Sequence, residues 1–246
     1  MNERSSPWWY RRRDAVFGMI YGLGFMVGGL ISGAVQGTYV PAYVVFGSFA
    51  GRSGVLAFLI AGTALTVACF ALRVWGSSYL SEGVVWTENA RVDRLLVNGP
   101  FRFTRNPLYL GNLLMALGVG VVASPAGWAI VIIGVWLFVL ALVRWEERGL
   151  HARYGDEFTQ YCADVPALLP RVRPVPETGG GVPPSLGAGL RAEVFSGAIA
   201  LGMIAVLSLG RTNGLYAFAA LFVIGIVGQR LTTRSARRRL QQSPSP

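Results

Sequence analysis

Long apolar runs alternate with short polar segments along the 246-residue chain. Six of these runs approach the roughly 20 residues that an α-helix needs to cross a bilayer. They lie at residues 15–35, 55–74, 107–123, 126–143, 193–210 and 213–229. The pattern therefore predicts an all-α integral membrane protein with about six transmembrane helices, in which residues 107–143 form a helical hairpin.

Two apolar segments admit other interpretations. Residues 38–50 are short and interrupted by Pro41, which favours an outer loop or a re-entrant segment over a span. The first run follows Arg11, Arg12 and Arg13, as the core of a signal peptide would. Its apolar stretch is longer than such a core and further spans follow it, so a membrane helix is the stronger prediction.

The arginines predict how the spans are oriented. All 22 basic residues are arginine, and 20 of them lie in four segments, at 1–14, 73–106, 144–192 and 230–246. Positive charge concentrates in cytoplasmic loops, so these segments and both termini are predicted to be cytoplasmic. A chain without lysine is also typical of a bacterial genome rich in G and C, which suggests the bacterial inner membrane. The arginines flank apolar runs, so the net charge of +10 favours a membrane over nucleic acid as partner.

The composition limits the chemistry that the chain can perform. His151 is the only histidine, which removes any multi-histidine metal site, and we expect no metal. It would also have to be the base of any Ser-His-Asp triad. Cys69 and Cys162 do not make a disulfide framework. No expected span carries the kind of internal charge that lines an ion pathway, which argues against a transporter.

The segment "GPFRFTRNPLYLGN" at residues 99–112 is the strongest candidate for chemistry. Asn106 and Pro107 suit the N-cap and first position of a helix, and this structural role alone could explain them. A helix start also attracts anions, and Arg102 and Arg105 add positive charge there. These arginines could bind an acidic or phosphorylated ligand. Contact with lipid headgroups alone is a simpler explanation of Arg102 and Arg105.

The hairpin predicts which residues face this segment. Each arm rises about 1.5 Å per residue and spans roughly 25 Å, so both arms return to one face of the membrane. Glu146 and Glu147 should therefore lie beside Arg102, Arg105 and Tyr109. Carboxylates at a helix C-terminus oppose the helix dipole.

Two explanations of the acidic pair stay open. Both carboxylates could simply pair with Arg144 and Arg148 on their own helix. Alternatively, carboxylates facing guanidinium groups suit a zwitterionic cofactor such as S-adenosylmethionine.

Residues 148–170 predict an amphipathic helix in the membrane interface. Tyr154, Phe158 and Tyr161 recur at helical spacing, and the prolines at 166 and 170 end the pattern. The helix could also act as a lid over the site. Within the hairpin, glycines seven residues apart predict close helix packing rather than a nucleotide loop.

Three stretches in order resemble the isoprenylcysteine carboxyl methyltransferase and phospholipid methyltransferase superfamily. They are "GPFRFTRNPLYLGN", then "ASPAG" at 123–127, then "RWEERGLHARYGDEFTQYCADVPALLP" at 144–170. The family pattern reads G-P-Y-R-x-x-R-H-P-x-Y-x-G, a hairpin, an acidic pair and a block of aromatic residues, and the resemblance covers about residues 72–171. It implies a membrane enzyme that uses S-adenosylmethionine and takes a lipophilic acceptor from the bilayer.

The resemblance also implies roles for particular residues. The catalytic candidates are Arg105, Glu146 and Glu147. The expected cofactor-binding residues are Gly99, Pro100, Arg102, Arg105, Asn106, Pro107, Tyr109, Glu146, Glu147 and Tyr154. Members of the family that methylate carboxyl groups usually carry histidine where this chain has Asn106. In having asparagine at this position, the chain resembles the branch that methylates phosphatidylethanolamine. An isoprenylcysteine O-methyltransferase-like activity is the first expectation and phospholipid N-methylation the alternative.

Two further alternatives and a domain division complete the expectations. An NADPH-dependent enzyme like the sterol reductases, or a lipid-binding membrane protein without activity, would share much of the pattern. We divide the chain into N-terminal transmembrane helices at 1–71, a methyltransferase core at 72–171 and a Pro/Gly linker at 172–192. A two-helix appendix at 193–230 and a basic disordered tail at 231–246 follow.

Overall fold

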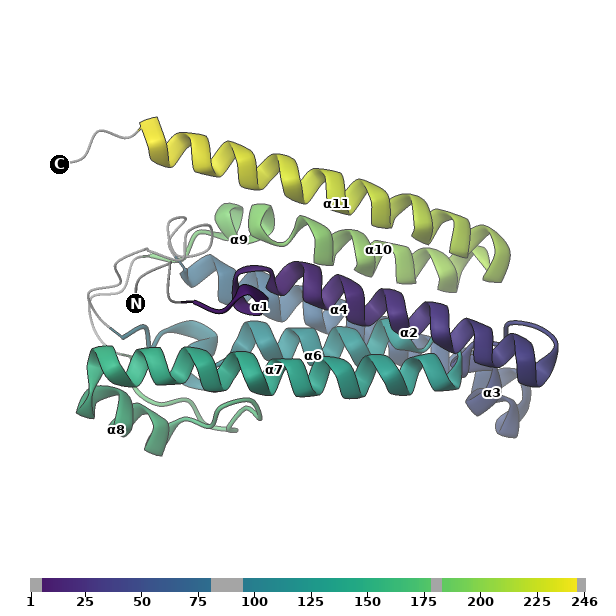
Figure 1. The fold of residues 1–246 in the computed structure, drawn as a ribbon, viewed down its shortest axis with the longest axis horizontal. Coiled ribbons are helices and arrows are strands. Elements are labelled where there is room, and N and C mark those ends of the chain that lie inside the picture. The colour runs from purple at the N-terminus through teal and green to yellow at the C-terminus, as the bar shows by residue number, and fades with distance from the viewer. Residues whose placement is uncertain (1–5, 81–94, 178–182, 243–246) are drawn as a thin grey trace.

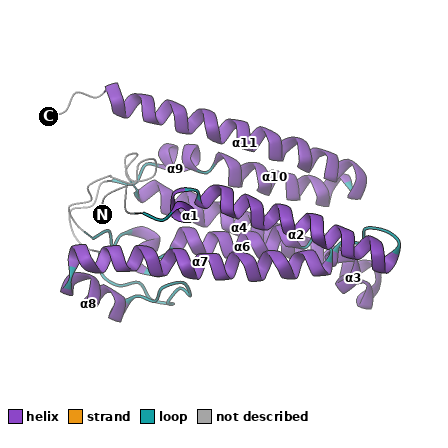
Figure 2. Ribbon diagram, viewed as in Figure 1, coloured by secondary structure: helices purple, strands orange, loops and turns teal. Residues whose placement is uncertain are grey.

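The computed structural model describes residues 6–80, 95–177 and 183–242, with side chains as far as Ala236. Within these ranges the regular structure is entirely helical, as predicted (Figure 2). The α-helices are α1 (Trp8–Arg11), α2 (Arg13–Gln36), α3 (Ala42–Gly47), α4 (Gly51–Tyr79), α6 (Pro107–Gly120), α7 (Pro125–Tyr154), α8 (Asp156–Asp164), α9 (Leu186–Ala192), α10 (Val194–Leu209) and α11 (Arg211–Gln242). Short 3₁₀ turns, η2 (Ser48–Ala50) and η3 (Gly99–Arg102), precede α4 and α6.

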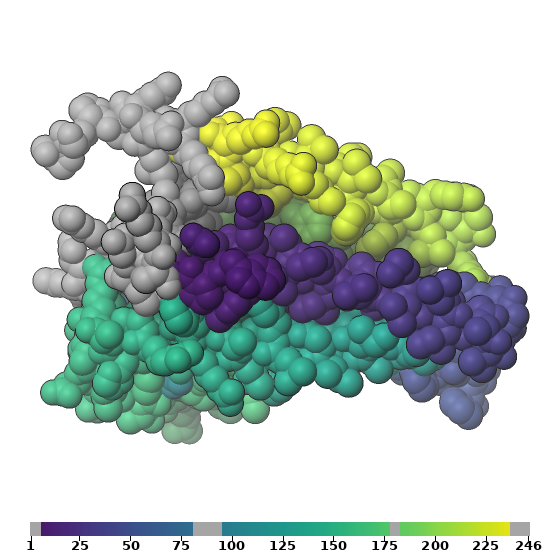
Figure 3. Space-filling model, viewed as in Figure 1, coloured from purple at the N-terminus to yellow at the C-terminus, as the bar shows by residue number. Residues whose placement is uncertain are grey.

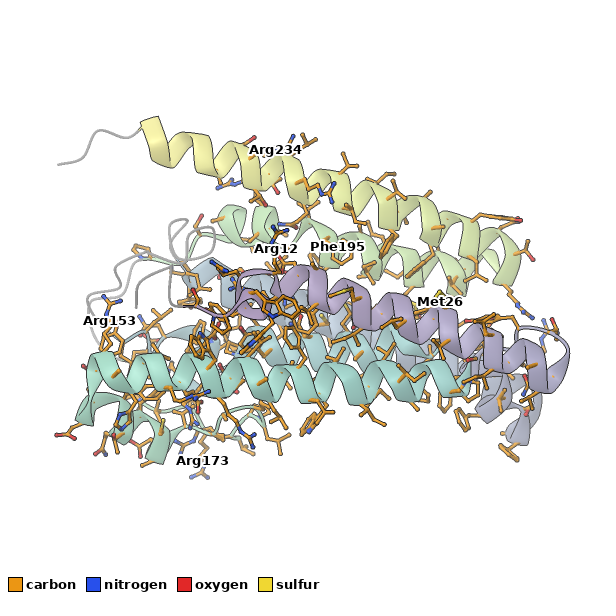
Figure 4. The ribbon with its side chains drawn as sticks, in the orientation of Figure 1. Arg12, Met26, Arg153, Arg173, Phe195 and Arg234 are labelled. Atoms are coloured by element: carbon orange, nitrogen blue, oxygen red, sulfur yellow. The ribbon has the colours of Figure 1, made fainter. Side chains whose placement is uncertain are left out.

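The long helices lie side by side in one elongated bundle (Figure 1). Helix α2 packs on α7, α4 packs on α6 and on α10, and α10 packs on α11. Helix α1 and the C-terminal end of α11 lie toward the end of the bundle where α6 begins and α7 ends. The labelled arginines in Figure 4, at positions 12, 153, 173 and 234, lie in that same half, whereas Met26 lies toward the other end. This arrangement agrees with the arginine pattern that predicts one common face for the polar segments.

The expectation of six spans holds only in part. Four helical segments are long and apolar enough to cross a membrane, and a fifth arises if α9 and α10, which bend by 72° at their junction, count as one span. Helix α6 has 14 residues, which gives about 21 Å and is short of the roughly 30 Å hydrocarbon core. The span predicted at 107–123 is longer than α6 because residues 121–123 form a turn.

That turn explains the apolar segment at 38–50. Ala42 and Tyr43 donate backbone hydrogen bonds to the carbonyls of Ala123 and Val121, at 2.7 and 3.0 Å. The Tyr39 hydroxyl donates to the carbonyl of Val122 at 2.6 Å. Backbone polar groups away from water need such partners. The segment therefore covers the tip of the α6–α7 hairpin, and its α3 folds back along the start of α4.

Small residues let the helices approach closely, as the glycine spacing predicted. A Cβ on Gly118 would lie 2.6 Å from the carbonyl oxygen of Gly62 in α4. A Cβ on Gly127 would lie 2.6 Å from the carbonyl oxygen of Gly24 in α2. The two arms of the hairpin therefore each pack backbone to backbone on a different neighbour, which fixes the hairpin between α2 and α4.

The chain departs from the expected helix boundaries at two places. The predicted amphipathic helix is divided, because Gly155 adopts a positive φ of 52° that ends α7 and starts α8. Helix α11 continues to Gln242, through most of the segment predicted to be a disordered tail. Leucine, arginine, alanine and glutamine all favour helix, which explains why the basic composition did not end it.

Candidate functional site

The polar segment before α6 is held against the segment that follows α8. Gly99 takes a positive φ of 55°, and a Cβ there would lie 2.5 Å from the ring of Tyr79. The hydroxyl of Tyr161 in α8 donates to the carbonyl of Phe101 at 2.7 Å. Burial raises the pKa of Tyr161, so this phenol stays protonated and keeps its donor. Thr104 is buried, and the single hydrogen of its hydroxyl is shared between the carbonyls of Ala167 and Leu168, both 3.1 Å away.

Arg105 joins this segment to the acidic pair on α7. Its Nε and Nη2 atoms lie 2.9 and 2.8 Å from Oε1 of Glu147. Its Nη1 donates to the carbonyls of Cys162 and Val165. The guanidinium group therefore donates most of its hydrogen bonds to Glu147 of α7 and to carbonyls at the end of α8. Only 12% of the Arg105 side chain is exposed. The guanidinium group that was expected to bind a ligand is therefore paired with a carboxylate of the protein itself.

Asn106 also faces Glu147. It occupies the N-cap position of α6, yet its side chain makes no capping hydrogen bond. Its Nδ2 instead donates to the carbonyl of Ala167 at 3.1 Å and approaches Oε1 of Glu147 at 3.4 Å. Helix capping alone therefore does not account for this asparagine.

Glu146 is held by two phenols from separate helices. Tyr109 in α6 donates to its Oε1 at 2.7 Å, and Tyr10 in α1 donates to the same atom at 3.0 Å. The guanidinium of Arg13 lies over the Tyr10 ring, 5.1 Å from its centre. Trp9 packs edge-on against Trp145, so the N-terminal helix lies directly on α7 (Figure 3).

The carboxylates thus pair across the hairpin and not along their own helix. Arg148 donates to the carbonyl of Arg144 at 3.0 Å, and its guanidinium lies over the ring of Trp145. The ion pair that the structure gives for Glu147 is with Arg105. The simpler explanation of the acidic pair, neutralisation by Arg144 and Arg148, is not what the packing shows.

Other predicted site residues lie apart from the two carboxylates. Arg102 donates to the carbonyl of Val175 at 2.6 Å and pairs with Glu177 at 3.0 Å. Gly99 and Pro100 shape the turn next to it. Tyr154 packs on the buried cluster around Phe158, on α8. These residues border the site from the loop side without touching Glu146 or Glu147 through any contact given by the structure.

Several polar residues at or near the site were missed in the sequence. Tyr10 and Arg13 lie in "WWYRRR", whose arginines were interpreted only as charges that orient the first membrane span. Arg73, which the arginine count placed in the cytoplasmic segment 73–106, lies inside α4 and pairs with Glu193. Glu193 is the only acidic residue after Glu177, and a lone acid at the start of an apolar run could have revealed it.

A family model and known proteins each match part of this chain. Residues 53–157 match the family model of phospholipid methyltransferases. The chain is 31% identical over 116 residues to the cobalt-zinc-cadmium resistance protein CzcN of Cupriavidus metallidurans, covering 45% of this chain and 53% of that protein. It is 26% identical over 100 residues to the nickel-cobalt-cadmium resistance protein NccN of Alcaligenes xylosoxydans xylosoxydans, covering 41% of this chain and 44% of that protein.

The chain spans about half the length of the curated relatives it matches. Among solved structures, no significant match was found. The apolar helices and the membrane-enzyme family together identify an integral membrane protein. The resemblance drawn from the motifs is thereby confirmed: the segment 53–157, which contains Arg105, Asn106, Tyr109, Glu146 and Glu147, matches the phospholipid methyltransferase family model.

Proposed function

We propose that this protein is a membrane methyltransferase that uses S-adenosylmethionine and modifies a lipophilic acceptor. The observation that carries the proposal is the adjacent pair of carboxylates, Glu146 and Glu147, held from the opposite arm of the hairpin by Tyr109, Asn106 and Arg105. The family match over the same residues supports methyl transfer as the reaction.

The two carboxylates have the chemistry to hold the cofactor. Oε1 of each accepts the hydrogen bonds described above, whereas Oε2 of each accepts none from the part of the chain that the structure describes. Glu147 keeps 23% of its side chain exposed. Two fixed carboxylates with acceptor capacity fit the α-ammonium group and the ribose hydroxyls of S-adenosylmethionine.

Each of the chain's own residues has a distinct task in this proposal. Glu146 and Glu147 bind and orient the cofactor. Arg105 and Asn106 hold Glu147, and the phenols of Tyr10 and Tyr109 hold Glu146. When bound, S-adenosylmethionine supplies an electrophilic methyl carbon. Orientation of this kind can supply on the order of 7–11 kcal/mol of a barrier, and a carboxylate acceptor needs no base.

The acceptor is proposed to be lipophilic because the site lies at the end of a bundle of apolar helices. The first candidate is a carboxylate of a prenylated compound, as in isoprenylcysteine carboxyl methyltransferases. The second is the amine of a phospholipid, which Asn106 favours by its similarity to that branch. An amine acceptor must lose a proton, and a carboxylate of the acidic pair could take it, whereas asparagine cannot.

Isotope transfer in the presence of lipid tests the proposal. The purified protein, reconstituted in nanodiscs, is incubated with bacterial lipid extract and with S-adenosylmethionine labelled in the methyl group. Mass spectrometry should find the label in a lipid-soluble product, and the mass and chemical class of that product separate the carboxylate from the amine acceptor. Binding of NADPH with no binding of S-adenosylmethionine would favour a reductase instead, and binding of lipid alone would favour a non-enzymatic protein.

A further inference from the structure

A second polar centre lies on the other side of α6, inside the helical bundle. Arg73 of α4 meets Glu193 at the junction of α9 and α10 through two parallel contacts, Nε to Oε2 at 2.6 Å and Nη2 to Oε1 at 3.0 Å. The hydroxyls of Ser77 and Ser196 each donate to Glu193 at 2.9 Å. Glu193 is only 4% exposed. Burying an ion pair inside a helical bundle costs desolvation free energy. Such a pair therefore suggests a functional role.

The third nitrogen of Arg73 reaches the helix that carries the site. Nη1 donates to Oδ1 of Asn112 at 2.7 Å and to the carbonyl of Leu108 at 3.2 Å. Leu108 directly precedes Tyr109, which holds Glu146. One guanidinium group therefore connects the C-terminal helices to the first turns of α6.

Glycines make this connection possible. A Cβ on Gly111 would lie 2.5 Å from Cγ of Arg73, so the glycine of the family motif leaves room for the arginine stem. A Cβ on Gly189 would lie 2.6 Å from the carbonyl oxygen of Val74, so α9 lies directly on α4. The backbone of Ser185 also donates to the carbonyl of Ser78 at 2.8 Å. The docking of α9 and α10 is thus built around the ion pair.

The geometry points to Glu193 and Arg73 as positioning residues, through which the C-terminal helices outside the family-matched segment set the position of α6 and hence of Tyr109 and Asn106. This inference rests on the proposed function, because its readout is methyl transfer. It assigns the two-helix appendix a role in the site, although α10 contributes no side chain to the acidic pair through any contact that the structure gives.

Variants that separate stability from positioning test the inference. Glu193→Gln keeps the shape but leaves the Arg73 charge unpaired, so both stability and methyl transfer should fall. The double variant Arg73→Met with Glu193→Met replaces the pair by apolar side chains, which is often neutral or stabilising. We expect the double variant to regain thermal stability while methyl transfer stays lower by about tenfold to a hundredfold, as for a small misplacement of reacting groups.

Two single substitutions complete the design. Asn112→Leu leaves the Arg73–Glu193 pair and the bond to the Leu108 carbonyl intact but removes the shorter bond from Arg73 to α6, and it should lower turnover without weakening the helix packing. Leu201→Ala, on an exposed face of α10, is the control and should leave turnover unchanged. The inference is overturned if the double variant regains full methyl transfer together with its stability, or if Asn112→Leu is as active as the wild type. A wild-type protein that neither binds S-adenosylmethionine nor transfers methyl groups would instead refute the proposed function.

Discussion

At the residue scale, the arginines of "RFTR" have different surroundings although they are three positions apart. Arg105 is 12% exposed and shares its donors between Glu147 and two carbonyls, whereas Arg102 pairs with the exposed Glu177. A planar guanidinium can bridge several acceptors at once, and an ammonium group cannot copy that geometry. The two positions therefore should respond differently to the same substitution.

Arg105→Lys is expected to leave the protein folded and to lower kcat/KM of methyl transfer at least about tenfold, or about 1.4 kcal/mol. The loss arises because Glu147 is no longer fixed toward the site. Arg102→Lys is the matched control and should lose much less. Equal and small effects of the two substitutions on initial rates would show that Arg105 does not position Glu147.

Tyr10 is a second residue-scale test, because it reaches Glu146 from outside the family-matched segment. Tyr10→Phe removes one hydrogen bond to a charged group, which is worth roughly 1.5–3 kcal/mol. The affinity for S-adenosylmethionine, measured by calorimetry, should fall by about tenfold or more. Tyr216→Phe, in an exposed part of α11, should bind like the wild type. Unchanged binding by Tyr10→Phe would leave the N-terminal helix without a role in the site.

At the element scale, the α6–α7 hairpin depends on the cap of its second arm. The Ser124 hydroxyl accepts from the backbone of Gly127 at 3.2 Å and donates to the carbonyl of Gly28 in α2 at 2.7 Å. One buried side chain thus begins α7 and also ties the hairpin to α2.

Ser124→Ala is expected to destabilise the protein by about 1–2 kcal/mol, the usual cost of a lost N-cap. Thermal unfolding in detergent measures this as a lower Tm. Ser53→Ala is the control, because the Ser53 hydroxyl makes an exposed bond within its own turn. Affinity for S-adenosylmethionine at low temperature should be unchanged, since Ser124 lies at the far end of the hairpin from the carboxylates. A Tm equal to that of the control would contradict the role of this cap.

At the scale of the whole molecule, hydropathy and helix geometry predicted the helical bundle and the return of α7 to the start of α6. The rise per residue alone placed Glu146 and Glu147 near Arg105 and Tyr109. The short α6 could not be foreseen, because its end is fixed by backbone bonds to the distant residues 42 and 43.

Long-range polar contacts could not be predicted from the sequence either. Tyr10 and Glu146 are 136 positions apart, and Arg73 and Glu193 are 120 apart, so no local pattern connects them. Arg102 was placed with the acidic pair because its turn was not known, and η3 directs it to Val175. Local periodicity determines helices well, whereas the partners of polar side chains depend on how distant helices pack.

The arrangement of the bundle leads to a prediction about membrane orientation. Helix α1 and the C-terminal end of α11 lie toward the same end as the site, and the arginine distribution predicts that this end is cytoplasmic. In a background with Cys69→Ala and Cys162→Ser, cysteines at Arg52 and Arg211 should react with an impermeant thiol reagent added outside intact cells. A cysteine at Arg173 should react only after the cells are opened. The reverse pattern would place the site on the outer face, away from cytosolic S-adenosylmethionine.

Calorimetric titration with S-adenosylmethionine tests the central claim most directly. It measures how Glu146 and Glu147 contribute to cofactor affinity, and it does not require the acceptor to be known. The wild type should bind the cofactor, and Glu146→Gln and Glu147→Gln should each bind it about 10- to 150-fold more weakly, a larger effect than the one on thermal stability. The substitution Glu157→Gln, at an exposed position in the first turn of α8, should bind like the wild type. Wild-type affinity in both site variants would contradict the account, since Glu146 and Glu147 would then be structural partners of Tyr109 and Arg105 alone.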